Sequence, residues 1–341
     1  MPKRPTIADI AREAGVSKGA VSYALNGQPG VSETTRQRIL AIADRVGFRA
    51  SAAARALAGA PAKMVGLALQ RPARTLGVEP FFLELISGLE AELSLHSYAL
   101  LLQMVPDERA EAETEIYRQW WHEKRVDGVL LCDVRSGDPR VSAVHRIGLP
   151  AVVVGPPAAG GPLASIWSDD AVSMTEAVEH LAGLGHRRIA RVAGIRELAH
   201  TATRTAAFEA ACARLDLAPP RTVWTDYTGE NGARATRGLL DSDDPPTAVI
   251  YDNDIMAIAG LATAQQMGHR VPVDLSIVAW DDSPVCPLVH PPLTALTRDI
   301  VAYGTHAARL LLATIAGERV ADLHDEPAHL TVRASTGPSP T

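Results

Sequence analysis

The chain has few aromatic residues, few cysteines and no long apolar run. Aromatic side chains make up 4% of its 341 residues, which disfavours an aromatic-lined carbohydrate groove and a stacking platform for single-stranded nucleic acid. Cys132, Cys212 and Cys286 lie far apart without metal-ligand spacing, so we expect reduced thiols, no metal site and a cytoplasmic location. No segment approaches the ~18 apolar residues of a membrane helix, and no apolar signal core follows the basic N-terminus.

The residues that are present indicate a globular protein of about two domains. Hydrophobic residues make up 47% and charged residues 21%, which suffices for a packed core. The net charge of −6 is unevenly distributed, because residues 1–62 hold nine Lys and Arg against four Asp and Glu. This segment therefore carries +5 and the remainder −11. A small basic module on a larger acidic body suggests that the module has an anionic partner.

Residues 1–49 are predicted to form a small all-α domain of three helices. The expected helices, each with a capping Ser or Thr before it, run from Thr6 to Gly15, from Ser17 to about Leu25, and from Ser32 to about Val46. A core this small is stable mainly if the helices pack tightly.

The first two helices have the spacing of a helix-turn-helix. With Ile7 as the first position, Ala11 falls where the helices cross and only a small residue fits, and Gly15 falls where the turn needs a positive φ. The inward positions are apolar: Ile10, Ala14, Val16, Val21 and Ala24. A generic helical hairpin is the alternative, but it would not require all of these constraints at once. The second helix is therefore expected to lie in the major groove of DNA.

Residues on the outward face of that helix and at helix N-termini are the DNA-binding candidates. Lys18 can donate to guanine or to a phosphate, Tyr23 can pack on a thymine methyl, and Gly19 lets the backbone approach the groove. Ala20 either contacts a thymine methyl or packs against the first helix, and Arg36 is either a phosphate contact or a solvated surface group. The candidates are Thr6, Ser17, Lys18, Gly19, Ala20, Ser22, Tyr23, Asn26, Ser32 and Arg36.

From about residue 61 short apolar strands alternate with amphipathic helices. Strands are expected at 65–69, 99–104, 128–132, 151–154, 189–192, 248–251 and 276–279, and helices at 82–95, 109–123, 171–184, 202–215, 231–240 and 255–267. This alternation predicts parallel sheets covered by helices on both faces. The length of the segment favours two α/β subdomains.

The segment Thr6–Gly27 resembles the signature of the lactose/galactose repressor (LacI/GalR) family of bacterial transcriptional regulators, and the resemblance continues through 31–36 and 54–59. It implies a hinge helix and linker at 50–60 that order on operator DNA, with Leu57 wedging a base step in the minor groove. An isolated helix this short is marginal in water, which suits such a role. The implied hinge contacts are Ser51, Ala54, Arg55 and Leu57. Ala50-Ser51 stands where many members have Pro-Asn, a departure that bears on hinge ordering.

The body resembles the family's effector-binding domain, which is similar to periplasmic binding proteins. The matching segments are 79–82, 168–170, 180–190, 204–208, 251–257, 278–284 and 331–336. The resemblance implies two Rossmann-like subdomains of the type I periplasmic-binding-protein-like fold, joined by crossover strands, with a ligand in the cleft between them. We expect an N-subdomain at about 61–161 plus 291–322 and a C-subdomain at about 162–290 plus 323–341.

The effector-binding candidates follow predicted strands or open helices. They are Gln70, Phe82, Arg204, Asp254 and Asp281. Carboxylates there can accept hydrogen bonds from sugar hydroxyls or a nucleobase edge, and an arginine supplies a fork of donors. The alternatives are that Asp254 caps the following helix, that Phe82 belongs to the core, and that Asp281 pairs with an arginine. A sugar and a nucleoside-like effector both stay open.

No enzymatic motif accompanies these candidates. The chain has no Walker-type phosphate loop, dinucleotide fingerprint, nucleophile elbow or paired-histidine zinc helix. We therefore expect no cofactor and no catalytic site. The chain ends soon after 334–336, without the tetramer helix of the family's founding member, so the expected assembly is a homodimer.

The resulting expectation is a sequence-specific DNA-binding transcriptional repressor, associated with the nucleoid when bound to its operator. A small-molecule effector between the body subdomains would control its affinity for double-stranded operator DNA. The alternatives are an activator, a sensor for a nucleoside or nucleobase, a transport-type solute-binding protein, and a sugar-metabolising enzyme with a helical head.

Overall fold

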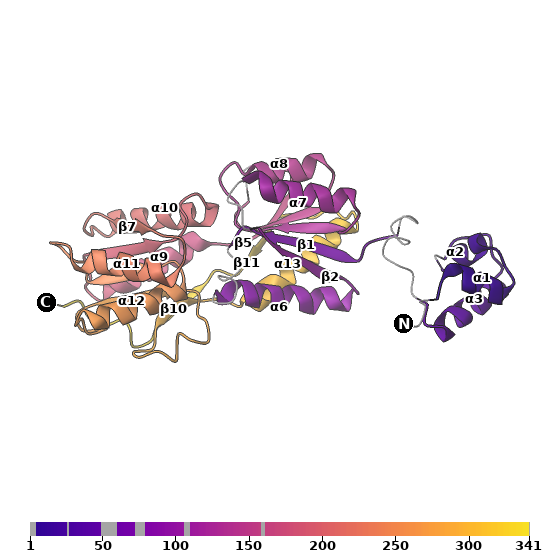
Figure 1. Cartoon of the computed structure of the whole chain (residues 1–341). Coiled ribbons are helices and arrows are strands. Elements are labelled where there is room, and N and C mark those ends of the chain that lie inside the picture. Colours follow the sequence, from indigo (N-terminus) through magenta and orange to yellow (C-terminus); the bar gives the residue numbers. More distant parts are fainter. Residues whose placement is uncertain are drawn as a thin grey trace. The chain divides into compact units, whose positions relative to one another are not determined.

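The computed structural model describes residues 5–25, 27–48, 60–71, 79–105, 110–157 and 161–340. The chain divides into two compact units, Met1–Lys63 and Met64–Thr341, called the head and the body below. Figure 1 labels their helices and strands. In the described parts of the chain, no helix is both long enough and apolar enough to cross a membrane.

The described residues of the head form the three expected helices, which confirms that part of the sequence analysis. They are α1 (Ile7–Ala14), α2 (Lys18–Leu25) and α3 (Glu33–Arg45). The buried residues of all three helices form one small cluster that includes Ile10, Val21 and Ile39.

The ends of these helices have the chemistry that the sequence predicts. The hydroxyl and backbone N–H of Thr6 bind the Asp9 carboxylate, while the Asp9 N–H donates to Thr6, so the two form a capping box. Gly15 ends α1 at φ 65°, and its N–H donates to the carbonyls of Ala11 and Arg12. No atom lies within 4 Å of where a Cβ on Gly15 would be, so the backbone conformation, not space, requires glycine there.

The body contains two six-stranded sheets. The first has the order β11-β5-β4-β3-β1-β2, with all pairs parallel. Its strands are β1 (Met64–Leu69), β2 (Ala99–Met104), β3 (Gly128–Leu131), β4 (Ala151–Val154), β5 (Ala164–Ser168) and β11 (Leu323–Asp325). The accompanying helices are α6 (Pro80–Leu95), α7 (Ala110–His122), α8 (Pro139–Arg146) and α13 (Ile300–Ile315).

The second sheet has the order β12-β10-β9-β8-β6-β7, in which only the pair of β12 with β10 is antiparallel. Its strands are β6 (Ile189–Ala193), β7 (Arg221–Trp224), β8 (Ala248–Tyr251), β9 (Ser276–Trp280), β10 (Thr294–Thr297) and β12 (His329–Thr331). The accompanying helices are α9 (Asp170–Gly183), α10 (Ala199–Arg214), α11 (Gly229–Leu240) and α12 (Asp254–Gln266). Figure 1 shows the two sheets as separate layered subdomains of the body.

Close helix packing explains where α13 lies. A Cβ on Gly88 of α6 would stand 2.0 Å from the Val301 carbonyl oxygen, and one on Gly304 of α13 would stand 2.3 Å from the Leu85 carbonyl oxygen. Only glycine at both positions lets the two backbones approach this closely. Helix α13 therefore belongs with the first sheet, although it follows a strand of the second.

The segments that pass between the sheets differ from the expected subdomain bounds. Strands β5 and β11 lie in the first sheet and β10 in the second, so the passages fall several residues later than the expected bounds at 161, 290 and 322. The apolar pattern of a short strand does not say which sheet it joins. Tertiary pairing decides this, as in the register of Val152 with Ala164 and of Leu323 with Ile166.

Candidate functional sites

The outward face of α2 exposes the residues proposed to bind DNA. Lys18 and Gly19 are exposed, and the Tyr23 side chain is 47% exposed. A Cβ on Gly19 would meet only the Ser17 hydroxyl, at 3.7 Å, so the packing of the head does not require glycine there. Because Gly19 has no side chain, the backbone of a binding partner can approach α2 closely beside Lys18.

The hydroxyls at the helix N-termini are already hydrogen-bonded within the head. Ser17 accepts from the Ala20 N–H at 3.1 Å, and Ser32 accepts from the Thr35 N–H at 3.3 Å. Arg36 is half-buried and donates to the Gln28 carbonyl at 2.7 Å, so it is anchored to the preceding turn. Five candidates lie outside the described residues: Asn26, Ser51, Ala54, Arg55 and Leu57.

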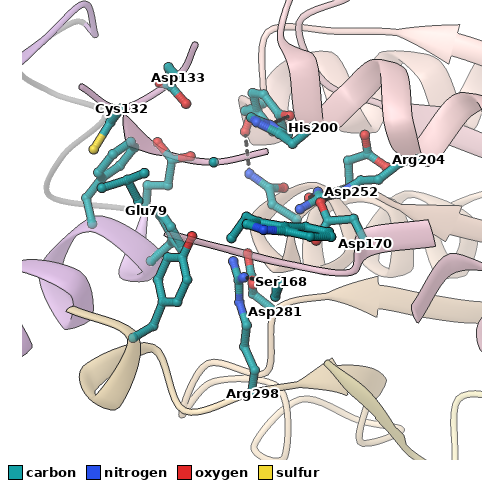
Figure 2. Close-up of a pocket in the computed structure, with 18 of the residues that line it drawn as sticks. Glu79, Cys132, Asp133, Ser168, Asp170, His200, Arg204, Asp252, Asp281 and Arg298 are labelled. Atoms are coloured by element: carbon teal, nitrogen blue, oxygen red, sulfur yellow. Dashed lines mark hydrogen bonds and ion pairs between the residues drawn. The ribbon is translucent and has the colours of Figure 1, made fainter. Parts of the chain in front are cut away.

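The body contains a cavity of about 190 Å³ between its two subdomains (Figure 2). Residues at the ends of β3, β4 and β5 and at the start of α6 line it from one subdomain. Residues of α10 and those that follow β8 and β9 line it from the other. Ligands of open α/β sheets bind at these carboxyl ends of strands. Four of the five predicted effector residues line the cavity: Phe82, Arg204, Asp254 and Asp281.

Arg204 is held firmly in the cavity wall. Its Nε donates to Asp170 Oδ2 at 2.8 Å, its Nη1 donates to the Asp252 carbonyl at 3.3 Å, and its guanidinium carbon lies 3.6 Å from the centre of the Trp280 ring. The neighbouring carboxylates outweigh burial and raise its pKa further. Arg204 is therefore a fixed, charged donor at this wall.

Asp254 is the first residue of α12 but not its cap. The Asn253 side chain accepts from the Met256 N–H at 2.8 Å and caps the helix, so the capping alternative for Asp254 is wrong. Asp254 Oδ1 accepts from the Ile255 N–H, while its Oδ2 is buried without a hydrogen-bond partner. Burial raises the pKa of Asp254 to about 6; the neighbouring Ser283 hydroxyl opposes this shift and Asp281 reinforces it.

Phe82 and Asp281 occupy the cavity wall in different ways. Phe82 is 1% exposed and belongs to the hydrophobic core as well as to the lining, so both interpretations of it hold. Asp281 has a φ of 65° and a buried, unpartnered Oδ1. Burial raises the pKa of Asp281 above its ordinary value, although the nearby Arg298 and Arg204 oppose this shift. No ion pair within 4 Å joins Asp281 to an arginine in the described part of the chain, so the pairing alternative is not what the structure shows.

Gln70 does not line the cavity; the next residue, Arg71, does. The Gln70 Oε1 accepts from Arg135 at 3.4 Å. Arg71 Nη2 pairs with Asp133 Oδ2 at 3.0 Å, and its guanidinium lies 5.1 Å from the centre of the Tyr227 ring in the other subdomain. The backbone turns directly after β1, where the Arg71 N–H donates to the Leu69 carbonyl at 2.9 Å.

Glu79 and Arg298 are among the polar lining residues that the sequence analysis did not name as effector-binding candidates. Glu79 precedes α6 without capping it, and its Oε2 lies 4.0 Å from Arg71 Nε, too far for a hydrogen bond. Burial raises the pKa of Glu79 to about 7, against the opposing effect of Arg71. Arg298 follows β10 and donates from Nη1 to the Ser168 hydroxyl at 2.8 Å. The match at 79–82 could have pointed to Glu79, whereas nothing in the sequence signalled Arg298.

Unpartnered polar atoms gather in this cavity. In the described part of the chain, seven buried side-chain nitrogen and oxygen atoms have no hydrogen-bond partner, and five of them belong to residues that line the cavity. The five atoms are Arg71 Nε, Glu79 Oε2, Asp254 Oδ2, Asp281 Oδ1 and Arg298 Nε. Buried polar groups are normally bonded, and leaving one unmet is costly. The cavity therefore has the form of a binding site for a polar molecule.

A buried ion pair beside the cavity shows the contrasting, satisfied arrangement. Arg191 donates to both carboxylate oxygens of Asp252, at 2.8 and 2.6 Å, and both side chains are fully buried. The Gly194 N–H also donates to Asp252 Oδ2, at 3.1 Å. Both oxygens of Asp252 are therefore occupied by bonds within the protein, although Asp252 lies in the same short segment after β8 as Asn253 and Asp254.

Known families match both the head and the body of this chain. Residues 6–51 match the family of bacterial regulatory proteins of the lacI type, and residues 178–336 match the periplasmic binding protein-like domain. The chain is 30% identical over 321 residues to the HTH-type transcriptional regulator CelR of Thermobifida fusca, covering 93% of each chain.

Two solved structures are similar to this chain in both sequence and fold. A LacI family transcriptional regulator from Bifidobacterium animalis subsp. lactis shares 39% identity at a TM-score of 0.75, covering 82% of this chain and 100% of that one. The complex of the regulator CelR with cellobiose shares 28% identity at a TM-score of 0.73, covering 97% and 100%.

A helix-turn-helix head on a two-subdomain body with a polar cavity defines a DNA-binding regulator that responds to a ligand. The relatives that match along nearly the whole chain are transcriptional regulators of this kind. The chain belongs to the LacI family of bacterial transcriptional regulators.

Proposed function

We propose that this regulator is a cytoplasmic homodimeric repressor, not an enzyme, and that an uncharged, hydroxyl-rich effector controls its operator affinity from the body cavity. The five unpartnered polar atoms of the lining carry the proposal. The relative CelR, whose solved structure is a complex with cellobiose, supports a carbohydrate as the chemical class. The lining includes the aromatic residues Phe81, Trp167 and Tyr303, so the low aromatic content of the chain does not disfavour a carbohydrate site here.

The unpartnered atoms favour hydroxyl groups as their partners. Arg71 Nε is a donor and Glu79 Oε2 an acceptor, and they stand 4.0 Å apart without bonding each other. A hydroxyl donates to a carboxylate and accepts from a guanidinium at the same time. Arg298 Nε and Asp281 Oδ1 supply a second unpartnered donor and acceptor. A ligand with hydroxyls at two separate positions satisfies both sets.

The charges of the cavity disfavour an anionic effector. Arg71 is paired with Asp133, and Arg204 is paired with Asp170. Arg298 is the remaining lining arginine, and three lining carboxyl groups, including Glu79 and Asp254, have no arginine within hydrogen-bonding distance of the unpartnered oxygen. These three carboxyl groups outnumber Arg298, a lining arginine that forms no ion pair within 4 Å in the described part of the chain, so a phosphate would add negative charge to a buried lining that already has an excess of carboxyl groups, which is costly. We therefore infer a neutral ligand.

On the DNA side, two heads of a dimer read the half-sites of a near-palindromic operator. The exposed Lys18 and Tyr23 would contact bases or phosphates in the major groove, with Gly19 allowing close approach. The expected hinge at 50–60 would read the centre of the operator. Effector binding changes the balance between DNA-competent and incompetent arrangements of the body, which is the basis of the control.

A thermal-shift experiment on the full chain tests the effector class. The panel consists of neutral mono- and disaccharides, nucleosides and sugar phosphates, each also tested on the Asp254→Asn variant. A neutral sugar at 100 times its Kd is expected to stabilise the protein by about 2.7 kcal/mol, and the variant to lose this shift. The same sugar should change the affinity of the protein for DNA taken from upstream of its own gene. The sugar should be recovered chemically unaltered.

Three results would contradict the proposal. Stabilisation by sugar phosphates alone would show that the inference of a neutral ligand is wrong, and stabilisation by nucleosides alone would show that the carbohydrate class is wrong. A sugar that stabilises the protein without changing operator affinity would separate the cavity from regulation. Turnover of the sugar would show an enzymatic activity.

A further inference from the structure

The loop between β3 and α8 belongs to the first subdomain, and its backbone bonds to the second. The Val134 carbonyl accepts a hydrogen bond from the Ala199 N–H at 2.8 Å, and Arg135 forms an isolated antiparallel β-bridge with Leu198. Leu198 and Ala199 stand at the start of α10, in the second subdomain. Residues 133–138 are called the clasp below, because their backbone joins the two subdomains.

The clasp completes the N-terminus of α10. The helix begins after Leu198, whose side chain makes no capping hydrogen bond, so its first N–H groups need acceptors from elsewhere. Ala199 finds its acceptor in the other subdomain. Helix α10 also carries His200 and Arg204 into the cavity. Opening the cleft would remove the acceptor from a helix that presents ligand-binding residues.

The same loop holds one of the unpartnered donors of the cavity. Asp133, with a φ of 52°, pairs through Oδ2 with Arg71 Nη2 at 3.0 Å. Asp133 and His200, which Figure 2 labels, both line the cavity, one from each subdomain. A ligand bonded to Arg71 Nε is therefore connected to the clasp through one ion pair.

A buried arginine sets the shape of the clasp. Arg140 of α8 donates from Nε to Asp138 Oδ1 at 3.0 Å, from Nη2 to Asp138 Oδ2 at 2.6 Å, and from Nη2 to the Asp133 carbonyl at 2.9 Å. It also pairs with the buried Glu113 of α7. Asp138 Oδ2 in turn accepts from the Arg135 N–H at 3.0 Å. One planar guanidinium thus fixes both ends of the loop, a task for which arginine geometry is suited.

We propose that Arg140 is a positioning residue for effector control: it holds the clasp in the shape that caps α10 across the cleft, and so links cleft closure to the ligand in the cavity. This inference deepens the regulation of the cavity and rests on the proposed function only in taking the cavity as the effector site. Arg140 itself does not line the cavity.

The first test removes one backbone N–H that crosses the cleft, that of Ala199. Ala199→Pro deletes this donor at the first helical position, where proline is tolerated. Leu198, at φ −75° and ψ 137°, already has the conformation that precedes a proline. Ala199→Ser keeps the N–H at the same site. Gly229→Pro places proline at the first position of α11, where an added Cβ meets its neighbours at 3.4 Å or more.

The readout is the distance between the two subdomains in the full chain, without effector or DNA. Spin labels at Ser142→Cys on α8 and Glu209→Cys on α10 occupy exposed positions, whereas the three native cysteines are buried. Ala199→Pro is expected to raise the ratio of long to short distances about five-fold, the factor that one net hydrogen bond supports. The two control variants are expected to keep the distribution of the parent protein.

The second test removes Arg140 without leaving a charge unpaired at Glu113. Arg140→Gln combined with Glu113→Gln should shift the distances in the same direction as Ala199→Pro. Arg140→Lys, which keeps the charge but not the fork, should produce a smaller shift in that direction. Thermal melting is recorded on every variant. A merely structural role would lower Tm and leave the distances unchanged.

Unchanged distances in Ala199→Pro would overturn the clasp, and unchanged distances in both Arg140 variants would overturn the role of Arg140. If the double variant fails to fold, Arg140→Lys still decides the second point. Because neither ligand nor DNA is present, these outcomes are independent of whether the proposed effector class is correct.

Discussion

The head and the body present their functional groups in opposite ways. In the head, Lys18 is exposed, and hydroxyls such as those of Ser17 and Ser32 are already bonded as helix caps. In the body, the polar atoms of the cavity are buried, and five of them lack partners. In the head, an exposed DNA-binding side chain such as Lys18 can therefore be changed without loss of stability. In the body, the unpartnered ligand-binding groups reduce the stability of the ligand-free fold.

The contrast also holds within the body, over only three residues. Asp252 is bonded by Arg191 and by a backbone N–H, whereas Asp254 keeps one oxygen unpartnered. Both follow the same strand and both are buried. The first carboxylate stabilises the fold, and the second is available to a ligand at a cost to stability.

The largest effect is expected for Asp252→Asn. This change leaves the fully buried Arg191 without its charged partner, which costs about 3–5 kcal/mol. Urea unfolding of the full chain measures the loss. Asp244→Asn is the matched control, because Asp244 forms an exposed ion pair with Arg188, of the kind that contributes about 0–1 kcal/mol. Equal losses in the two variants would remove the distinction between the satisfied and surface pairs.

Lys18→Ala is expected to weaken operator binding by about 1–3 kcal/mol, roughly 5- to 150-fold, because it removes a base or phosphate contact. The Tm of the head should stay unchanged, since Lys18 is exposed. Fluorescence anisotropy with labelled operator measures the affinity. Arg12→Ala, which removes an exposed positive charge from α1, controls for net charge. Equal weakening by both variants would mean that α2 has no special role.

Asp254→Asn is expected to improve the stability of the ligand-free body while removing effector binding. The pKa of Asp254 is raised to about 6 by burial, so the folded state binds its proton more tightly than the unfolded state does. Stability therefore falls as pH rises from about 4 to 6. The asparagine variant lacks this fall and should be more stable than the parent at pH 8, by about 1–3 kcal/mol.

Thermal melting at pH 4, 6 and 8 measures this effect, with the exposed Asp243→Asn as the control. Glu79, whose pKa is raised to about 7, adds a fall of the same sign that persists in both variants up to about pH 7. A variant that is less stable than the parent at pH 8 would show that Asp254 supports the fold instead of awaiting a ligand.

The smallest effect is expected for a pair of caps. Ser17→Ala and Ser32→Ala each remove one side-chain cap, at about 1 kcal/mol, and should lower the stability of the head equally. If the N-terminus of α2 also binds a phosphate, Ser17→Ala will weaken operator binding more than Ser32→Ala does. Identical operator affinities in the two variants would limit Ser17 to its structural role.

The fold of the head was predictable because its signals are local. Thr6, Gly15, Ser17 and Ser32 determine the helix ends through contacts with residues three or four positions away, and helical periodicity determines which side chains face the core. In the body, strands that are fully buried, such as 151–154, were predictable from their apolar runs. The half-exposed edge strand 221–224 and the three-residue strands β11 and β12 have no such pattern and were missed.

The cavity was predictable only in part, because it depends on tertiary contacts. Asp254 and Arg204 were found because they match the family's motif or follow an evident strand. Arg71, Glu79 and Arg298 come from separate segments, and only the assembled sheets show that their free atoms meet in one cavity. The same limit explains Gln70, which the sequence could not distinguish from its neighbour.

The control of operator affinity by a ligand in the body cavity is tested most directly by measuring the affinity for DNA taken from upstream of the protein's own gene. The measurement is made with and without the neutral sugar that stabilises the protein. We expect the sugar to change this affinity by roughly 5- to 150-fold, corresponding to a coupling of ~1–3 kcal/mol, in the parent protein and not in Asp254→Asn. An equal change in both proteins, or no change in either, would contradict this expectation.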